Sequence, residues 1–330
     1  MESERLAEKA LKILQEKSQK ALELAKKTIL EEKMEYKKAD EAIKYYLSTW
    51  NDTTRPGMLS IACEAVGENS EEVVPLQIAL LFIDATMDIH DDIIDESAAK
   101  NNRKTIYGKF GKETALLIGN AFMVKGFNRL YRTLENLPKG QRLLIIDTVK
   151  DFLLDVVNAH ILENQLKDKK WKIKPETYLQ VLTTKAADIE GHMKIGALYG
   201  GGSPKEIHAL SKYGRNLGVL LAVRSDFVDV FEPNELINKV RYECLPLPIL
   251  YALQDEKYKK RIRGILLKNN MDETDCSELV EIIYKTKETS LLKQYLSGLE
   301  KEALQVLNML PRNQVRSKLA LIIGSMLEDL

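Results

Sequence analysis

Apolar residues recur every three or four positions along almost the whole chain, which is the spacing of an amphipathic helix. Leu6, Ala10, Ile13 and Leu14 begin the first of these patterns, and strand-like alternation between hairpin turns is missing from the sequence. The sequence predicts two N-terminal helical segments and then helices over residues 58–66, 74–96, 113–135, 142–165, 175–199, 204–231, 246–253, 258–267, 276–286, 288–307 and 313–327. We therefore expect an all-α fold, a large helical bundle that forms a single domain over residues 1–330.

The composition narrows the class of protein. Of 330 residues, 45% are hydrophobic, and the 49 basic and 49 acidic side chains cancel, so no net charge favours nucleic acid or an anionic membrane. Cys63, Cys244 and Cys276 are far apart, which is typical of reduced thiols in the cytosol. The charged N-terminus excludes a signal peptide, and no uncharged apolar run reaches about 18 residues. We expect a cytoplasmic protein without a transmembrane segment, in which the lysine-rich residues 167–174 form an exposed loop.

A carboxylate cluster closes the apolar run of residues 76–89. Its sequence is Asp91-Asp92-Ile93-Ile94-Asp95, and Asp91 and Asp95, four residues apart, share one face of the helix. Two carboxylates side by side repel one another unless a cation lies between them, and Mg²⁺ prefers such oxygen ligands together with phosphate oxygens. Taken alone, the cluster is more typical of an acidic helix end that faces solvent, because turns rich in aspartate are common.

A second apolar helix ends in the same way. Ser225, Asp226 and Asp229 follow the apolar residues 217–223. If both helices belong to one bundle, their carboxylates are able to face a shared cavity and to hold Mg²⁺ ions and a diphosphate between them.

With these motifs the chain resembles the trans-isoprenyl diphosphate synthase family, as a divergent member. The resemblance covers residues 55–253 and also rests on Phe110-Gly111 and on the residues Tyr213 to Gly218 before the second motif. It implies the isoprenoid-synthase helical fold and a reaction in which Mg²⁺ ions ionise an allylic diphosphate, whose carbocation alkylates isopentenyl diphosphate. Mg²⁺ and lysines would stabilise the departing diphosphate, and an apolar tunnel would protect the cation from water.

The donor half of the family's site is present. The resemblance makes Asp91 and Asp95 metal ligands and, with Lys185, catalytic residues. It implies further metal ligands at Ser225, Asp226 and Asp229, although Ser225 stands where the family has a charged aspartate. The side chains expected to bind the diphosphate are Lys100, Lys185, Lys239 and Arg55. Glu163 or, almost equally, Asp168 stands for a further acidic residue of the family.

The acceptor half differs from the family. Arg55 is retained, but Asp52 replaces a lysine, Asp84 replaces a histidine and Asn101 replaces an arginine. These changes reverse the local charge and would repel isopentenyl diphosphate by roughly a few kcal/mol. Asp84 and Asp88 lie on the same helix stripe as Asp91 and Asp95, and with Asp52 and Asn101 they suggest an acidic pocket for a cationic or hydroxylated acceptor.

Several alternatives stay open. For Asp84 and Asp88, pairing with buried lysines or arginines is slightly favoured over an acceptor pocket, because buried carboxylates are normally paired. His90, His160, His192 and His208 are interpreted as packing residues. Thr86 and Met87 stand where the family adjusts chain length, and neither is a large aromatic residue, so a long prenyl tail is expected to fit.

The resulting hypothesis is a Mg²⁺-dependent prenyltransferase that uses an allylic prenyl diphosphate and an acceptor other than standard isopentenyl diphosphate. A class I terpene cyclase or diphosphate lyase and a non-catalytic subunit of a heteromeric synthase are the alternatives. The family implies a homodimer, or a heterodimer with a related synthase. Met123, Phe127 and Leu130, within the helix predicted over residues 113–135, are candidate interface residues.

Overall fold

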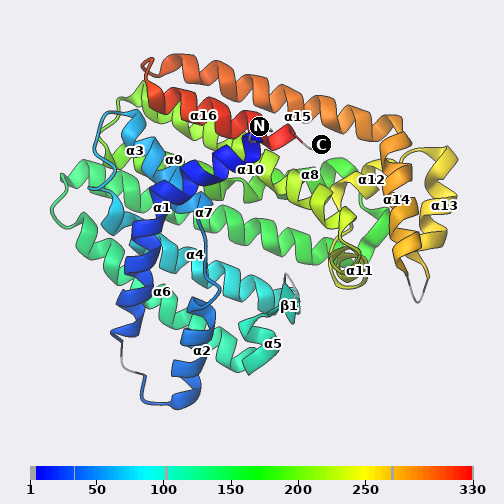
Figure 1. The fold of residues 1–330 in the computed structure, drawn as a ribbon, viewed down its shortest axis with the longest axis horizontal. Helices are drawn as coiled ribbons and strands as arrows, with labels where there is room; N and C mark the ends of the chain where they lie inside the picture. The colour runs from blue at the N-terminus through cyan, green and yellow to red at the C-terminus, as the bar shows by residue number, and fades with distance from the viewer. Residues whose placement is uncertain (1–4, 33, 101–102, 269–270, 329–330) are drawn as a thin grey trace. The chain divides into compact units, whose positions relative to one another are not determined.

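The computed structural model of the chain describes residues 5–32, 34–100, 103–268 and 271–328, and its fold is all-α (Figure 1). It divides into two compact units. The N-terminal unit comprises residues 8–147 and 192–207, and the C-terminal unit comprises residues 1–7, 148–191 and 208–330. The prediction of a single domain stays a prediction. The expected helical fold is confirmed.

The N-terminal unit contains the first helices of the chain and a short hairpin in which Ala99 pairs with Lys104. Its elements are α1 (Leu6–Leu30), α2 (Lys37–Leu47), α3 (Thr54–Ala65), α4 (Val74–Ile94), β1 (Ala99–Lys100), β2 (Arg103–Lys104), α5 (Ile106–Phe110) and α6 (Lys112–Leu134). Besides α1, whose first two residues belong to the C-terminal unit, three helices contribute residues to both units, namely α7 (Lys139–Leu166), α9 (Ala187–Tyr199) and α10 (Pro204–Phe231).

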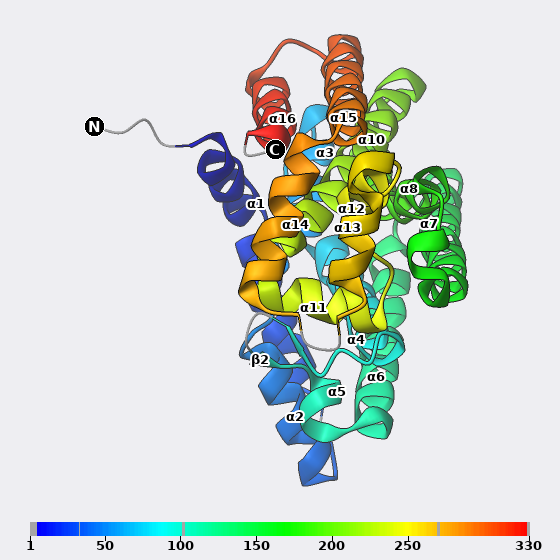
Figure 2. The same ribbon diagram turned by 90° about the vertical axis from the view of Figure 1, so that its right-hand side faces the viewer.

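The C-terminal unit holds the remaining elements. They are η1 (Lys167–Lys172), α8 (Pro175–Lys185), α11 (Pro233–Tyr242), α12 (Leu247–Ala252), α13 (Glu256–Leu266), α14 (Glu273–Lys285), α15 (Lys287–Val306), η2 (Leu307–Met309), α16 (Gln314–Gly324) and η3 (Ser325–Leu327). In this unit α12 packs on α8, α14 and α15, and α13 lies beside α14 (Figure 2).

The core of the N-terminal unit is built around α4 and α6. The apolar run of α4 buries almost every residue of its first three turns, and the helix packs along α6. Tyr46, Trp50, Phe82 and Phe122 form a cluster of aromatic rings whose centroids lie 5.3–5.9 Å apart. Helices α2 and α5 lie side by side in both ribbon views, and both contact α6 (Figures 1 and 2).

Two glycines of α6 allow the close approach of α4. A Cβ atom at Gly119 would lie 2.5 Å from His90 Nε2, and one at Gly126 would lie 2.8 Å from Ile83 Cγ1. The hydroxyl of Thr86 donates across the same contact to the Gly119 carbonyl at 3.0 Å. The contact fixes the last turns of α4 against α6.

In the C-terminal unit, polar side chains of α10 tie this helix to the end of the chain. Tyr213 donates to the Leu319 carbonyl at 2.8 Å, and Arg224 donates to the Met326 carbonyl at 2.8 Å. These buried and half-buried contacts position the last turns of α10, which carry the second acidic motif.

The predicted helices are found, with ends shifted by a few residues. The helix predicted over residues 175–199 is interrupted at Ala186 and forms α8 and α9. The sequence missed α5, which has only five residues, and α11, in which Leu236 is the buried residue. The predicted loop 167–174 contains the 3-10 helix η1 instead. Within the described part of the chain, no helix is long and apolar enough to cross a membrane.

Candidate active site

The first acidic cluster, Asp91, Asp92 and Asp95, lies at the C-terminal end of α4. Helix α4 ends here because its apolar face ends, and Asp95 is its C-cap residue. Lys100, on β1, lies beside the cluster: its Nζ is 2.7 Å from Asp92 Oδ1 and 3.7 Å from Asp91 Oδ2. The hairpin therefore brings a predicted diphosphate ligand to the predicted metal ligands.

Charge and burial compete in this cluster. Burial raises the pKa of Asp92, and the Lys100 ammonium opposes the change. Burial also disfavours the charge on Lys100, but Asp92 and Asp91 together outweigh it and hold the pKa of Lys100 above its usual value. Lys100 is thus a persistent cation at neutral pH.

Arg55 lies in the first turn of α3 and is bound by two aspartates. Its Nη1 donates to Asp52 Oδ2 at 2.9 Å and to Asp88 Oδ2 at 3.2 Å, and its Nη2 donates to Asp88 Oδ1 at 3.0 Å. Tyr46 is partly buried nearby, and desolvation followed by the charges of Asp88 and Asp52 raises the pKa of its hydroxyl well above the usual value. Asn101 lies outside the described residues.

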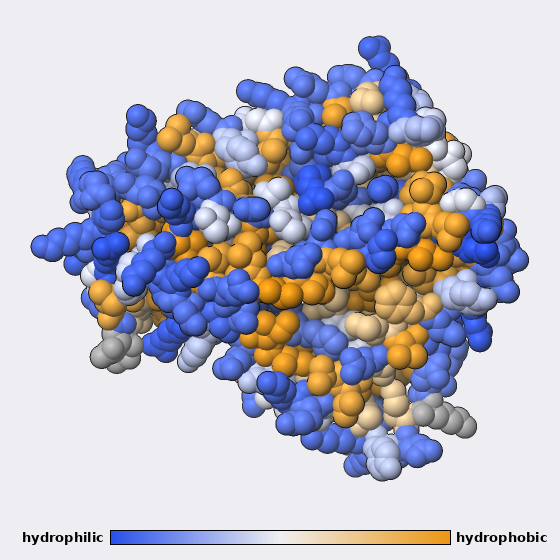
Figure 3. Space-filling model, turned by 180° about the vertical axis from the view of Figure 1, so that it is seen from behind, coloured by the Kyte–Doolittle hydropathy of each residue, from blue (hydrophilic) through white to orange (hydrophobic). Residues whose placement is uncertain are grey.

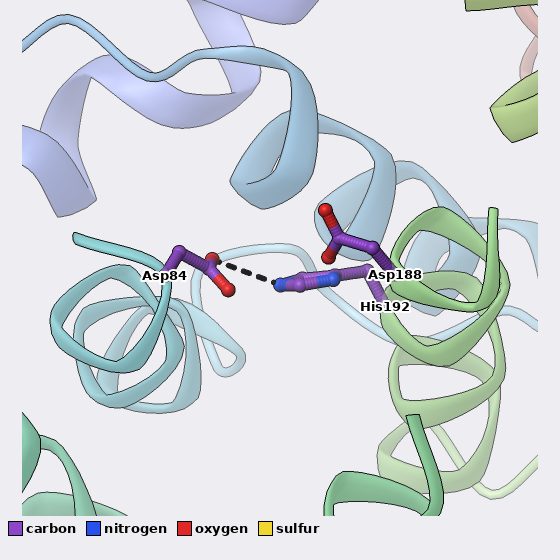
Figure 4. A group of neighbouring side chains, drawn as sticks. All are labelled: Asp84, Asp188 and His192. Atoms are coloured by element: carbon purple, nitrogen blue, oxygen red, sulfur yellow. Dashed lines mark hydrogen bonds and ion pairs between the residues drawn. The ribbon is translucent and has the colours of Figure 1, made fainter. Parts of the chain in front are cut away.

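Asp84, predicted for the same pocket, is buried and contacts a histidine. His192 Nε2 lies 3.1 Å from Asp84 Oδ2, and both side chains are buried in the N-terminal unit (Figure 4). His192 was predicted to be a packing residue, and it is also a polar partner. Asp188, drawn in the same view, precedes His192 by four residues on α9. His90 packs against Gly119.

The second acidic cluster, Ser225, Asp226 and Asp229, lies near the C-terminal end of α10. Lys239, on α11, places its Nζ 3.3 Å from Asp229 Oδ2 and 3.7 Å from Asp226 Oδ1. Burial raises the pKa of Asp226 to about 6, although Lys239 and the backbone N–H of Leu247 both act against this. The helix α11, missed in the sequence, is the element that delivers Lys239.

Glu163, on α7, contacts the catalytic candidate Lys185, and Tyr178 donates to Glu163 Oε1 at 3.3 Å. Asp168, the alternative to Glu163, is exposed on η1. Lys170 of the same segment donates to the Glu243 carbonyl at 3.0 Å. Glu163 is therefore the acidic residue that accompanies Lys185.

The two units divide the predicted residues between them. The N-terminal unit holds Arg55, Asp52, Asp84, Asp88, Asp91, Asp95 and Lys100, and the C-terminal unit holds Glu163, Lys185, Ser225, Asp226, Asp229 and Lys239. The sequence missed Asp92, His192, Tyr178, Lys170 and Glu243 as neighbours of these residues. A signal existed for Asp92, which stands inside the first acidic motif, and for Glu243, which follows Lys239 by four residues. His192, Lys170 and Tyr178 are 108, 73 and 15 residues from their partners Asp84, Glu243 and Glu163, so they give no local signal.

The two acidic clusters differ in how well they suit Mg²⁺. Asp91 and Asp95 are partly exposed carboxylates one turn apart at a helix C-terminus, and this donor set fits a hard cation. At the second cluster Ser225 is neutral, Asp226 is buried with partners at both oxygens, and Asp229 pairs with an ammonium. The second set does not fit a divalent cation.

Comparison with known proteins agrees with the fold and the motifs. The sequence profile of polyprenyl synthetase matches residues 36–283. The chain is 27% identical over 299 residues to a short chain isoprenyl diphosphate synthase of Methanothermobacter thermautotrophicus, with 87% of this chain and 89% of that protein covered. It is also 27% identical over 303 residues to heptaprenyl diphosphate synthase component 2 of Geobacillus stearothermophilus, with 88% of this chain and 90% of that protein covered.

A solved structure has the same fold. The geranylgeranyl pyrophosphate synthetase of Pyrococcus horikoshii superimposes with a TM-score of 0.84 at 22% identity, and the match covers 98% of this chain and all of that one. The family profile spans well over half of the chain. The chain therefore belongs to the polyprenyl synthetase family of prenyltransferases.

Proposed function

We propose that this chain is a Mg²⁺-dependent trans-prenyltransferase that uses an allylic prenyl diphosphate as donor and an acceptor other than isopentenyl diphosphate. The proposal that the acceptor is not isopentenyl diphosphate rests on one observation: Arg55 contacts two carboxylates. Arg55 is the cation that the family resemblance retains for the acceptor, and its guanidinium already bonds to Asp52 and Asp88. A second diphosphate would have to displace both carboxylates and remain beside them.

The proposed binding site for the allylic diphosphate donor is the first acidic cluster. Asp91 and Asp95 would hold Mg²⁺, which when bound would supply positive charge to the departing diphosphate. Lys100, in the same unit, would bind diphosphate oxygens and stabilise the charge that develops as the allylic C–O bond breaks. For Lys185, in the C-terminal unit, the same role stays a prediction. Lys239, the third lysine predicted for this role, is bound to the second acidic cluster instead.

The acceptor is proposed to be a molecule that carries a hydroxyl group or a positive charge. Asp52, Asp84 and Asp88 are the carboxylates predicted for the acceptor pocket, and Asp52 and Asp88 both contact Arg55. A carboxylate is able to accept a proton from a hydroxyl or to bind an ammonium group. Asp88, which is partly exposed, is the carboxylate to which an acceptor has access.

Thermal unfolding tests the donor assignment. Farnesyl diphosphate with Mg²⁺ should raise the melting temperature, because a ligand at 100 times its Kd adds about 2.7 kcal/mol to the free energy of unfolding. Asp91→Asn and Asp95→Asn should lose most of this stabilisation, whereas Asp40→Asn, in a surface ion pair of α2, should keep it. A wild-type protein that no allylic diphosphate stabilises in the presence of Mg²⁺ would refute the donor site.

Product analysis tests the acceptor assignment. Wild-type protein incubated with farnesyl diphosphate, isopentenyl diphosphate and Mg²⁺ should not form any prenyl diphosphate with a chain longer than farnesyl. Rapid elongation by the isolated chain would contradict the proposal. Release of diphosphate without any acceptor would instead favour the cyclase or lyase alternative.

We also propose that the chain acts as a dimer in the cytoplasm. Leu117, Val124 and Tyr131 repeat every seven residues on α6 and are 65%, 71% and 68% exposed, so they form an apolar stripe on the helix surface. Apolar side chains are visible on the face shown in Figure 3. Because relatives are named as component 2 of heptaprenyl diphosphate synthase, the partner is a second copy or a related synthase chain. Three buried free cysteines support a reducing compartment.

A further inference from the structure

Both carboxylate oxygens of Asp226 have interaction partners inside the C-terminal unit. Its Oδ2 accepts the backbone N–H of Leu247 at 2.8 Å, at the start of α12, and its Oδ1 faces Lys239 Nζ at 3.7 Å. The side chain is 4% exposed. Asp226 therefore anchors the first turn of α12, and its geometry leaves it turned away from solvent.

Lys239 is surrounded by acidic side chains. Besides Asp226, its Nζ lies 3.3 Å from Asp229 Oδ2 and 3.3 Å from Glu243 Oε2. Three carboxylates, two on α10 and one just after α11, therefore surround one ammonium, which contacts both carboxylates of the second acidic cluster.

Ser225 stands where the resembled family has an aspartate, so the second acidic cluster lacks one negative charge that would favour binding of a divalent cation. Ser225 and Asp229 are four residues apart on the exposed side of α10, the spacing at which Asp91 and Asp95 stand on α4. A serine hydroxyl is a neutral ligand. A divalent ion here would meet one carboxylate, that of Asp229, and would have to compete with the nearby ammonium for it.

We infer that the Lys239 ammonium takes the place of a divalent cation at the second acidic cluster, so that Asp226 and Asp229 hold no divalent cation. Lys239 is then a positioning residue: it neutralises Asp226, Asp229 and Glu243 and holds α10 and α11 together. The inference refines the proposed Mg²⁺-dependent function, but it concerns the C-terminal unit alone and holds whichever prenyl diphosphate is the donor.

Mn²⁺ binding to the full chain, followed by the electron paramagnetic resonance signal of free Mn²⁺, tests the inference without any assay of activity. Wild-type protein and Asp229→Asn should bind the same amount of Mn²⁺. Lys239→Met, which leaves three carboxylates without their cation, should bind about one additional Mn²⁺ per chain, and Lys239→Met/Asp229→Asn should lose it again. Lys185→Met is the matched control, because it removes an ammonium of the same unit whose partner is Glu163.

Two results would overturn the inference. One is a Mn²⁺ ion in wild-type protein that Asp229→Asn removes. The other is a folded Lys239→Met variant, checked by circular dichroism, with no Mn²⁺ site that depends on Asp229. Failure of the donor site would appear separately, as the absence of any Mn²⁺ that depends on Asp91 and Asp95.

Discussion

At the scale of single residues, the ion pairs of each basic side chain determine whether it is available to bind a substrate anion. Arg55 donates to two aspartates from different segments, Asp52 just before α3 and Asp88 on α4. Hydrogen bonds to charged groups contribute about 1.5–3 kcal/mol each, and the partial exposure of Arg55 and Asp88 places these toward the lower end. Their sum is sufficient to withhold Arg55 from a weakly bound anion.

Releasing Arg55 should therefore create affinity for isopentenyl diphosphate. We expect Asp52→Asn/Asp88→Asn to bind this anion about tenfold or more tightly than wild type, because two repulsive charges are removed and the guanidinium is freed. Each single variant should gain little, since the other carboxylate still holds Arg55. Isothermal titration calorimetry measures the affinities, with Asp40→Asn as the surface control. Equal affinities for the double variant and wild type would count against this role of Arg55.

The buried carboxyl of Asp226 should make stability depend on pH. Because burial raises its pKa to about 6 in the folded chain, its contribution to stability is complete below the ordinary aspartate pKa and is lost as pH rises through about 6. The full difference corresponds to at most about 3 kcal/mol. Asp226→Asn lacks this loss, so its melting temperature relative to wild type should increase between pH 4.5 and 7.5.

The control for this experiment is Ser225→Asn, which changes the adjacent position without a titratable group. Its melting temperature relative to wild type should stay constant over the same range. A constant difference for Asp226→Asn as well would show that the carboxyl does not titrate in this window.

At the scale of elements, the long helices could be predicted and the polar contacts between them could not. Helices α4, α6 and α10 have many apolar residues at helical spacing, so their existence and approximate ends follow from the pattern. Helix α11 buries only Leu236, so its apolar stripe is too thin to recognise. The Asp88–Arg55 pair joins residues 33 positions apart, and the Asp84–His192 pair joins residues 108 apart. Such pairing depends on tertiary packing and leaves no local pattern.

The α4–α6 contact gives a matched pair of substitutions. Gly119→Ala places a methyl group against His90, the residue before Asp91, whereas Gly126→Ala places one against Ile83 and the Ala79 carbonyl. Both variants should be destabilised by about 1–3 kcal/mol through overpacking. Gly119→Ala alone should also weaken the Mg²⁺-dependent stabilisation by farnesyl diphosphate, because the last turn of α4 must shift. Thermal unfolding with and without ligand measures both effects, and equal losses of ligand stabilisation in the two variants would contradict the argument.

At the scale of the whole molecule, the exposed apolar stripe on α6 points to assembly. The sequence suggested Met123, Phe127 and Leu130 as interface residues, but Leu130 is buried within the N-terminal unit while Phe127 is exposed. The helix is therefore rotated relative to that suggestion, and Val124 lies at the centre of the exposed stripe.

A charge in this stripe should separate the proposed dimer. Wild-type protein at micromolar concentration should have the mass of a dimer by size-exclusion chromatography with light scattering, and Val124→Glu should be monomeric, because an interface cannot readily bury an unpaired carboxylate. Tyr36→Glu, which changes an equally exposed aromatic residue before α2, should remain dimeric. A monomeric wild-type protein would exclude the homodimer and favour a heteromeric partner.

The contact of Arg55 with Asp52 and Asp88 also limits how this site is able to evolve. A mutation at Asp52 or at Asp88 alone leaves the guanidinium bound to the other carboxylate, so selection for a diphosphate acceptor finds no advantage in the first step. The benefit arises only when both have changed, which is epistasis between contacting residues. Under the proposed function, a change to a diphosphate acceptor would therefore have to pass through a single substitution that brings no gain in affinity, and this requirement slows such a change.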